Sequence, residues 1–388
     1  MQYDIVIVGG GMVGAALACS LQNKTLRIAL MDNALNHTED KRLIALNHSS
    51  YVLLKNIGIW PSLKPYAFAI QKVHVSHRGH FGTTSLSAKE LNKETLGYVV
   101  PAKEITAALY ARIAETKNIE LFRPATLLKL TAYPDDTDLT FTHETFEKNI
   151  TTKWLIGADG THSSVREMLS IETDTFDYHQ SALVTITELQ RHHSHTAYER
   201  FLTEGAIAML PLTEHSVATI WTDHEKTIEQ LQALSDREFL HALQTQFGYR
   251  LGRLKAIKTR FVYPLKRVMA KEQIKQRNIL VGNAAHTIHP IAAQGLNVAL
   301  YEIAVLADHF NKIPMDVLFP ADFLSFLKNI NLSHYLSGLF STDFFPINQM
   351  RQVGLIGFDL CVTAKRSFVK EIFGKASSRT PSLLKETS

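Results

Sequence analysis

A glycine-rich turn near the N-terminus constrains this sequence more than any other feature. Residues 5–8 form an unbroken β-branched run, and the next six residues, Gly9 to Gly14, fit the pattern G-x-G-x-x-G. Helix-forming residues follow from Ala15 to Leu21, and a second apolar run extends from Leu26 to Met31. This order of strand, glycine turn, helix and strand predicts the first βαβ unit of a dinucleotide-binding fold.

Each glycine of this turn has a chemical reason for its position. Gly9 permits a tight turn, Gly11 lets the backbone approach a pyrophosphate, and Gly14 lets the helix pack closely on the strand. The helix N-terminus then presents free N–H groups to the phosphates. Asp32 ends the second apolar run and can accept a hydrogen bond from an adenosine ribose. We therefore expect a dinucleotide cofactor rather than a purely structural turn, although this motif does not choose between NAD and FAD.

Composition limits the remaining possibilities. The chain has 388 residues, 45% hydrophobic and 20% charged, which suits two domains or one large domain with an insertion. Its net charge of +4 is too near balance for a dedicated nucleic-acid binder. Cys19 and Cys361 are too few for a disulfide framework, so we expect reduced thiols and a cytoplasmic location. We expect no targeting peptide and no membrane-spanning helix.

Two later segments repeat the change from a strand to a glycine turn. Residues 154–156 run into Gly157, and residues 278–281 run into Gly282 before a helical stretch. Between them the hydrophobic pattern alternates as in strands. The pattern predicts an α/β fold: a Rossmann-like cofactor-binding domain with an inserted strand-rich substrate domain and a helical C-terminus. The expected boundaries are 1–72, 101–180 and 271–338 for the cofactor-binding domain, 73–100 and 181–270 for the substrate domain, and 339–388 for the C-terminal segment.

Three segments together carry a resemblance to a known family. They are the glycine turn, the stretch Ala158-Asp159-Gly160, and the stretch from Gly282 to Asn297, which reads Gly-Asn-Ala-Ala-His, then Pro290, then Gln-Gly-Leu-Asn. This combination resembles the flavoprotein aromatic hydroxylases with the para-hydroxybenzoate hydroxylase fold, and within them the branch that acts in ubiquinone biosynthesis. Shorter matches lie at residues 41–46, 74–82, 96–100, 197–201, 209–212, 263–265 and 343–346.

The resemblance implies FAD as cofactor and NADPH or NADH as a transient reductant. It implies an FAD-dependent NAD(P)H monooxygenase that uses O₂ to hydroxylate a polyprenylated phenol of the 2-polyprenyl-6-methoxyphenol type. The implied FAD-binding residues are Gly9, Gly11, Gly14, Asp32, Arg42, Asp159, Gly282, Asn283, Pro290, Gln294, Gly295, Leu296 and Asn297. His289, Pro290 and Gln294 are expected to line the active site. No residue is identified as a base for the phenol.

Several positions depart from the family pattern. Asn283 and Glu302 stand where Asp is usual, and Ala293 and Ala299 stand where Gly is usual. The departures at Ala293, Ala299 and Glu302 favour one alternative, a non-catalytic prenyl-lipid-binding or accessory protein on the same scaffold. A flavoprotein that reduces isoprenoid double bonds is a further alternative.

Two further predictions concern a metal site and a membrane contact. His286 and His289 have the spacing of zinc ligands, but no third ligand is evident, so we expect no metal site. Basic and aromatic residues alternate between Lys365 and Phe373, which is typical of an amphipathic surface. We therefore expect a membrane-surface contact, on the inner face of the plasma membrane, or contact with another protein of the ubiquinone pathway.

Overall fold

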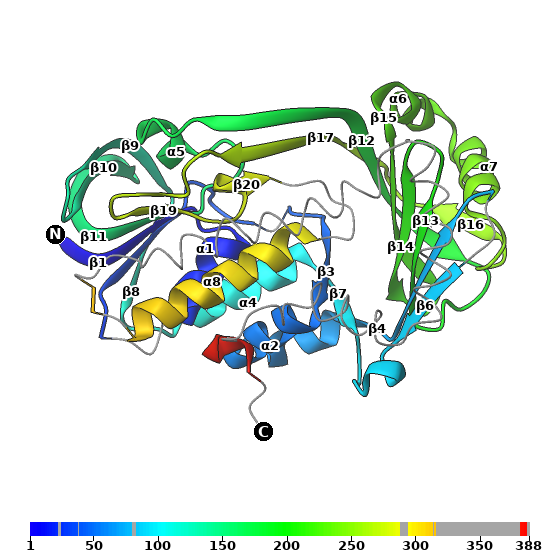
Figure 1. The fold of residues 1–388 in the computed structure, drawn as a ribbon, viewed down its shortest axis with the longest axis horizontal. Helices are drawn as coiled ribbons and strands as arrows, with labels where there is room; N and C mark the ends of the chain where they lie inside the picture. Colours follow the sequence, from blue (N-terminus) through cyan, green and yellow to red (C-terminus); the bar gives the residue numbers. More distant parts are fainter. Residues whose placement is uncertain are drawn as a thin grey trace.

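The computed structural model describes residues 1–21, 25–37, 39–79, 83–287, 294–312, 314–315 and 381–385. The chain forms two bodies, each built on a large β-sheet (Figure 1). Two long strands, β12 (Thr173–Leu189) and β17 (Phe261–Ala270), pair with each other and run from one body to the other.

The first body contains an eight-stranded sheet with β1 (Gln2–Val8) near its centre. β1 pairs in parallel with β2 (Ile28–Met31) on one side and with β11 (Phe146–Gly157) on the other. The run Ile5 to Val8 is buried on both faces, as expected for a central parallel strand. The remaining strands are β8 (Ile119–Phe122), β9 (Ala125–Ala132), β10 (Thr137–His143), β18 (Ile274–Lys275) and β19 (Asn278–Leu280).

Three helices pack on one another beside this sheet: α1 (Met12–Ser20), α4 (Ala102–Ala114) and α8 (Gln294–Lys312). α1 lies between the other two, and its Ala15, Ala16 and Leu17 are fully buried. The second hydrophobic cluster of the sheet includes residues of β9 and β10 and of the short helix α5 (Ser164–Met168). Apolar groups therefore cover the sheet around β1, and the core holds the glycine turn in place.

The second body contains a nine-stranded sheet whose two faces differ. Helices α6 (Glu225–Ala233) and α7 (Asp236–Phe247) cover one face, where Leu183, Met209 and Trp221 are buried against Phe239. The other face lies toward the first body (Figure 1). Besides β12 and β17, the strands are β5 (Lys72–His77), β6 (Thr83–Ser87), β13 (Thr196–Phe201), β14 (Ala206–Thr213), β15 (Ser216–His224), β16 (Leu254–Ile257) and β20 (His286–Thr287).

A three-stranded sheet made of β3 (Leu43–Asn47), β4 (Phe68–Ile70) and β7 (Gly97–Pro101) forms a third element. The sequence pattern places residues 97–100 in the inserted substrate layer, but β7 pairs with β3 and β4 instead. A Cβ on Gly97 would lie 2.2 Å from the Leu46 carbonyl oxygen, so glycine permits this close pairing. Tyr98 also packs against Trp60, with ring centroids 4.7 Å apart. Tertiary contacts therefore hold β7 in this sheet.

Short helices complete the described structure. They are α2 (His48–Asn56), α3 (Trp60–Leu63), and the 3₁₀ turns η1 (Lys64–Tyr66), η2 (Lys89–Leu91), η3 (Gly282–Ala284) and η5 (Ser382–Leu384). The Asn56 side chain donates to the carbonyls of Leu383 and Lys385, both at 2.9 Å, and so fixes η5 beside α2. The remainder of the segment 339–388 that we expect to be helical lies outside the described residues.

The expected boundary between residues 180 and 181 falls inside β12, because this strand continues through both bodies. The α/β fold class with a Rossmann-like domain is confirmed. In the described part of the chain, every helix is too short or too polar to cross a lipid bilayer.

Candidate cofactor and substrate site

The glycine turn between β1 and α1 combines tight packing with one open position. Gly9 has φ +105°, and a Cβ there would lie 2.4 Å from the Ala158 carbonyl oxygen. A Cβ on Gly14 would lie 1.9 Å from the Gly9 carbonyl oxygen. At Gly11, the N-cap of α1, a Cβ would meet nothing within 4 Å. Gly9 and Gly14 thus serve the packing of the protein, whereas Gly11 leaves space at the helix N-terminus for a phosphate.

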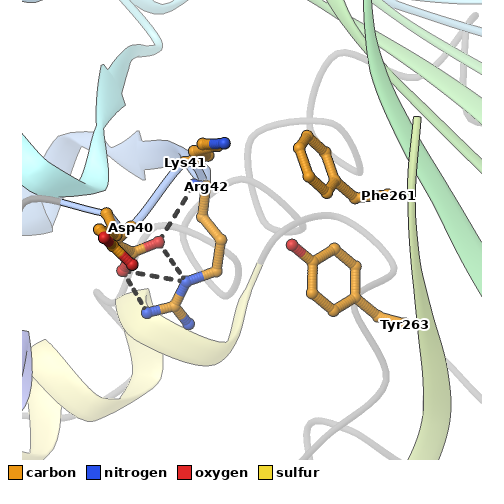
Figure 2. A pocket seen from close by; sticks show the side chains of 6 residues that line it. Asp40, Lys41, Arg42, Phe261 and Tyr263 are labelled. Carbon is orange, nitrogen blue, oxygen red and sulfur yellow. Dashed lines mark hydrogen bonds and ion pairs between the residues drawn. The ribbon is translucent and has the colours of Figure 1, made fainter. Parts of the chain in front are cut away.

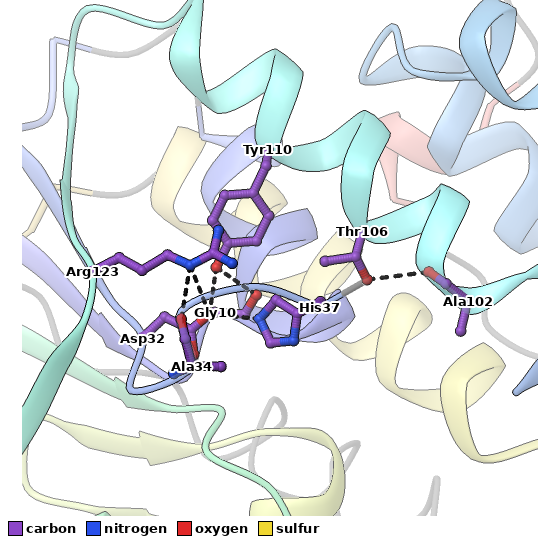
Figure 3. Close-up of polar contacts among 8 residues, drawn as sticks. All are labelled: Gly10, Asp32, Ala34, His37, Ala102, Thr106, Tyr110 and Arg123. Carbon is purple, nitrogen blue, oxygen red and sulfur yellow. Dashed lines mark hydrogen bonds and ion pairs between the residues drawn. The ribbon is translucent and has the colours of Figure 1, made fainter. Parts of the chain in front are cut away.

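Asp32, directly after β2, lies in a polar cluster next to this turn (Figure 3). Its carboxylate is 4% exposed and accepts a hydrogen bond from the Tyr110 hydroxyl at 2.6 Å. His37 Nε2 lies 2.6 Å from the same oxygen, and the Ala34 N–H donates to the other oxygen at 3.2 Å. The cluster therefore fixes Oδ2 with two short contacts and leaves Oδ1 with one long bond, free to accept from a ribose hydroxyl.

Tyr110 connects this carboxylate to the glycine turn. Its hydroxyl lies 3.0 Å from the Gly10 carbonyl oxygen as well as 2.6 Å from Asp32. Burial, and then the hydrogen bond and charge of Asp32, raise the pKa of Tyr110 far above its ordinary value. The hydroxyl consequently stays protonated and acts as a donor. Nothing in the local sequence pattern of α4 marks Tyr110 as a residue of this cluster.

Asp159 occupies the turn after β11. Its Oδ2 accepts from the Ser164 hydroxyl at 2.9 Å and from the Val165 N–H at 3.1 Å, at the start of α5. Its Oδ1 is buried and has no hydrogen-bond partner among the residues that the structure describes. A buried carboxylate oxygen without a partner is costly, so this atom is suited to a bound group that donates a hydrogen bond.

The three predicted segments meet at the glycine turn. A Cβ on Gly9 would lie 2.4 Å from the Ala158 carbonyl oxygen and 2.6 Å from the Asp159 nitrogen, so these backbones are in close contact. A Cβ on Gly282, which has φ +56°, would lie 3.2 Å from Val13 and 3.4 Å from Ala299. The turn after β19 is therefore adjacent to both α1 and α8, although more than 260 residues separate it from Val13 in the sequence.

Arg166 joins the second and third segments. Its guanidinium donates to the carbonyls of Thr161 and Ala284, both at 2.8 Å. The hydroxyls of Thr161 and Thr287 lie 3.0 Å apart and form a second link. Two segments more than a hundred residues apart are thus held in a fixed relation.

A buried ion pair anchors the turn after β19 to α8. Glu302 Oε1 lies 2.6 Å from His286 Nε2, and Glu302 Oε2 accepts from the Gly282 N–H at 3.1 Å. Burial alone would lower the pKa of His286, but the charge and hydrogen bond of Glu302 outweigh it and raise the pKa. Glu302, which the sequence marks only as a departure from the family pattern, is thus the residue that holds the turn.

The side chain of the predicted site residue Asn297 is bound to neighbouring segments of the protein. Its Oδ1 accepts from the Asn47 N–H at 2.9 Å and from the Ser50 hydroxyl at 2.7 Å, and its Nδ2 donates to the Ala45 carbonyl at 2.8 Å. The side chain fastens α8 to β3 and α2.

The remaining predicted residues of this region lie around the start of α8. Gly295 and Leu296 belong to its first turn, and Asn283 is exposed in η3. His289, Pro290, Ala293 and the side chain of Gln294 lie outside the described residues.

Arg42 lines a pocket of about 650 Å³ between the segment before β3 and the strand β17 (Figure 2). Its guanidinium forms an ion pair with Asp40, with a shortest distance of 2.6 Å. Phe261 and Tyr263 form the opposite wall, and the Lys41 ammonium lies 5.3 Å from the centre of the Phe261 ring. The partly exposed face of the nine-stranded sheet therefore meets the first body at this pocket.

The chain resembles known proteins along most of its length. The model of a family described as FAD binding domain matches residues 2–313. The chain is 29% identical to the ubiquinone hydroxylase UbiL of Rhodospirillum rubrum, over 98% of this chain and 92% of that protein. It is 27% identical to the 3-demethoxyubiquinol 3-hydroxylase of Escherichia coli, over 96% of this chain and 98% of that protein.

Solved structures share the fold at lower sequence identity. The p-nitrophenol 4-monooxygenase PnpA of Pseudomonas putida aligns with a TM-score of 0.74 at 15% identity, over 97% of this chain and 100% of that one. The anhydrotetracycline hydroxylase OxyS of Streptomyces rimosus aligns with a TM-score of 0.71 at 18% identity, over 97% of this chain and 77% of that one.

The open space at Gly11 gives a first prediction. Gly11→Ala should leave the unfolding midpoint of the cofactor-free protein unchanged, because the methyl group meets no protein atom within 4 Å. It should weaken FAD binding by about ten-fold or more, because the methyl group takes the place of a phosphate. Urea unfolding and fluorescence titration with FAD measure the two effects. Gly10→Ala is the contrast, since its Cβ would lie 2.2 Å from the Tyr110 hydroxyl and should destabilise the protein. FAD affinity equal to that of the wild type in Gly11→Ala would contradict this assignment.

The Tyr110 hydroxyl gives a second prediction. Tyr110→Phe removes a hydrogen bond to a buried carboxylate, and should lower the free energy of unfolding by about 1–3 kcal/mol. It should also weaken FAD binding, because Asp32 loses a group that orients it. The control is Tyr249→Phe, at a tyrosine that is 68% exposed. Equal effects of the two variants would show that the cluster at Asp32 has no special role.

The pair of His286 and Glu302 gives a third prediction. Glu302→Ala leaves a buried His286 without its partner and should cost about 3–5 kcal/mol of stability. Because Glu302 raises the pKa of His286, the pair contributes fully below the unfolded-state pKa of about 6.5. That contribution is lost as the pH rises through the raised pKa. The difference in unfolding free energy between Glu302→Ala and the wild type, measured by urea unfolding, should therefore be larger at about pH 6 than at about pH 9. Glu229→Ala, at an exposed position of α6, is the control, and a pH-independent difference would argue against a charged pair.

Proposed function

This chain belongs to the family of proteins with the FAD-binding domain, and we propose that it hydroxylates the aromatic ring of a polyprenylated phenol in ubiquinone biosynthesis. It is an FAD-dependent NAD(P)H monooxygenase of the aromatic hydroxylase class. The substrate we propose is of the 2-polyprenyl-6-methoxyphenol type. The observation that carries the proposal is the match, along nearly the whole chain, to relatives named as ubiquinone and demethoxyubiquinol hydroxylases.

The residues present fit FAD. The open space at Gly11 lies at the N-terminus of α1, where backbone N–H groups are suited to a pyrophosphate. Asp32 Oδ1 would be able to accept from a ribose hydroxyl, and the unpaired Oδ1 of Asp159 would be able to accept a hydrogen bond from a bound group. Gly282 and the start of α8 would lie on the flavin side of the same site. When bound, FAD would supply the redox chemistry, in which NAD(P)H provides two electrons and O₂ provides one oxygen atom to the substrate ring and the other to water.

The protein's own contribution is to position the substrate and to exclude water. The face of the nine-stranded sheet toward the first body presents partly exposed apolar side chains, among them Val184, Ala208 and Ile220. Such a wall suits a prenylated aromatic ring and disfavours water near the reacting atoms. Holding the ring beside the flavin replaces a bimolecular encounter by a fixed geometry.

A polyprenyl tail also bears on where the enzyme works. The tail partitions into lipid, so we propose that the enzyme works in the cytoplasm, at the inner surface of the plasma membrane. The basic and aromatic residues between Lys365 and Phe373, which would provide the membrane contact, lie outside the described residues.

The test uses the purified protein reconstituted with FAD. A short-chain 2-prenyl-6-methoxyphenol should accelerate NAD(P)H oxidation about ten-fold or more, consume O₂ in step, and yield a product heavier by one oxygen atom. Gly11→Ala is the matched control, and its rate should recover only at high FAD concentration.

Other outcomes would identify the alternatives. A product with a saturated double bond, formed without O₂ uptake, would indicate a reductase of isoprenoids. Bound prenyl lipid in a colourless protein that cannot be reconstituted with FAD would indicate an accessory protein. In a strain lacking the protein, mass spectrometry of the accumulated quinone precursor would identify the ring position.

A further inference from the structure

The face of the nine-stranded sheet toward the first body carries a carboxylate, that of Glu199 on β13. Side chains along a strand alternate between the two faces. Tyr198 lies on the helix-covered face, where its ring is 5.8 Å from that of Phe247, and Ala197 belongs to the cluster with Ile70 and Val99 on the opposite side. Glu199 therefore shares the face of Ala197. Its side chain is partly exposed, whereas Ala197 is buried.

The neighbours of Glu199 across the sheet are apolar. The strand register places it beside Val75 of β5 and Ala208 of β14. The same row continues across the sheet through Ile220 and Val184 to Phe261, each paired with the next. Phe261 lines the pocket that also contains Arg42. Glu199 is therefore part of an apolar wall that ends at the contact with the cofactor-binding body.

The charged groups around Glu199 point elsewhere. Arg200 lies on the other face, where its Nε donates to the Gln246 carbonyl at 2.8 Å. On β5 the next titratable side chain of this face is His77, which is paired with Phe201 rather than with Glu199. β14 also packs on β4 and β7, but Tyr98 of β7 packs against Trp60 on the opposite side of that strand. Among the described residues, none forms a hydrogen bond or an ion pair with the carboxyl of Glu199.

We propose that Glu199 receives the phenolic proton of the substrate, an inference that rests on the proposed function. The O–H bond of the phenol breaks, and a new O–H bond forms on the carboxylate. The electron pair stays on the phenol oxygen, so no group is oxidised or reduced in this step. The resulting phenolate has higher electron density at the ring carbons ortho and para to the oxygen, which favours attack on an electrophilic oxygen. When product leaves, the proton returns to its oxygen.

Loss of water to its apolar neighbours makes Glu199 a better base than an ordinary carboxylate, although its side chain stays partly exposed. This desolvation raises the pKa of Glu199 from 4.5 to about 7. A phenol has a pKa of about 10, so this change roughly halves the difference in pKa across which the proton moves. A base whose pKa lies near the working pH combines a useful charged fraction with a useful driving force. The apolar wall thus does two things, since it binds the ring and tunes the carboxylate.

The test follows the phenol itself in the oxidised FAD-bound enzyme, without NAD(P)H. A short-chain 2-prenyl-6-methoxyphenol is titrated into the protein, binding is read from the flavin spectrum, and ionisation is read from the phenolate absorbance. In the wild type, phenolate should form with a midpoint well below the phenol's own pKa of about 10. Glu199→Gln should bind the phenol within about three-fold of the wild-type Kd, form phenolate only near its solution pKa, and lose about 10²-fold in kcat.

Two further variants complete the experiment. Glu188→Gln changes an exposed glutamate of the same sheet and should match the wild type. Glu199→Asp retains a carboxylate and should keep part of the ionisation, whereas Glu199→Ala replaces the glutamine variant if that variant fails to hold FAD. Wild-type ionisation of the phenol in Glu199→Gln, or in Glu199→Ala used in its place, would overturn the assignment. If the wild type neither binds nor hydroxylates the phenol, the proposed function itself is wrong.

Discussion

Close backbone packing at the N-terminal glycine turn is the constraint on which the rest of this structure depends. β1, α1 and the turn after β11 approach so closely that a methyl group at Gly9 or Gly14 would overlap a carbonyl oxygen. This packing brings the turn before α1 next to the backbone of Asp159. Because protein interiors are as dense as organic crystals, such contacts leave little freedom in how the segments are arranged. The proposed cofactor site therefore depends on close packing that the fold itself requires.

Polar anchors hold the more distant segments against this turn. Arg166 donates to two main-chain carbonyls, and Glu302 binds both a buried histidine and the Gly282 N–H. Asn297 fastens α8 to β3 in the same way. Each anchor satisfies buried backbone groups that would otherwise lose hydrogen bonds to water. The anchors therefore stabilise loops whose own residues contribute little apolar surface.

The second body supplies what the first cannot, namely an apolar wall at the edge of a nucleotide-binding site. β12 and β17 are long enough to belong to both bodies, and they carry the wall to the pocket at Arg42. The helices α6 and α7 bury one face of this sheet, so its other face is the one available to a ligand. A carboxylate on that face lies in surroundings of low polarity, which changes its acidity without any opposing charge.

Local sequence determined the first βαβ unit, the Gly9 to Gly14 turn and the place of Asp32, because strand, turn and helix propensities act between residues close in the chain. The match to a flavoprotein family extended this to FAD and to the segments around Asp159 and Gly282. Only the tertiary structure decided that the Asn297 side chain binds other segments of the protein and that Glu302 pairs with His286. It also decided that β7 pairs with β3 and β4 instead of joining the substrate sheet, and that Glu199 lies within an apolar wall. These features depend on contacts between residues far apart in the chain and on the removal of water from them. Neither can be read from residue spacing, because both arise only when the segments pack.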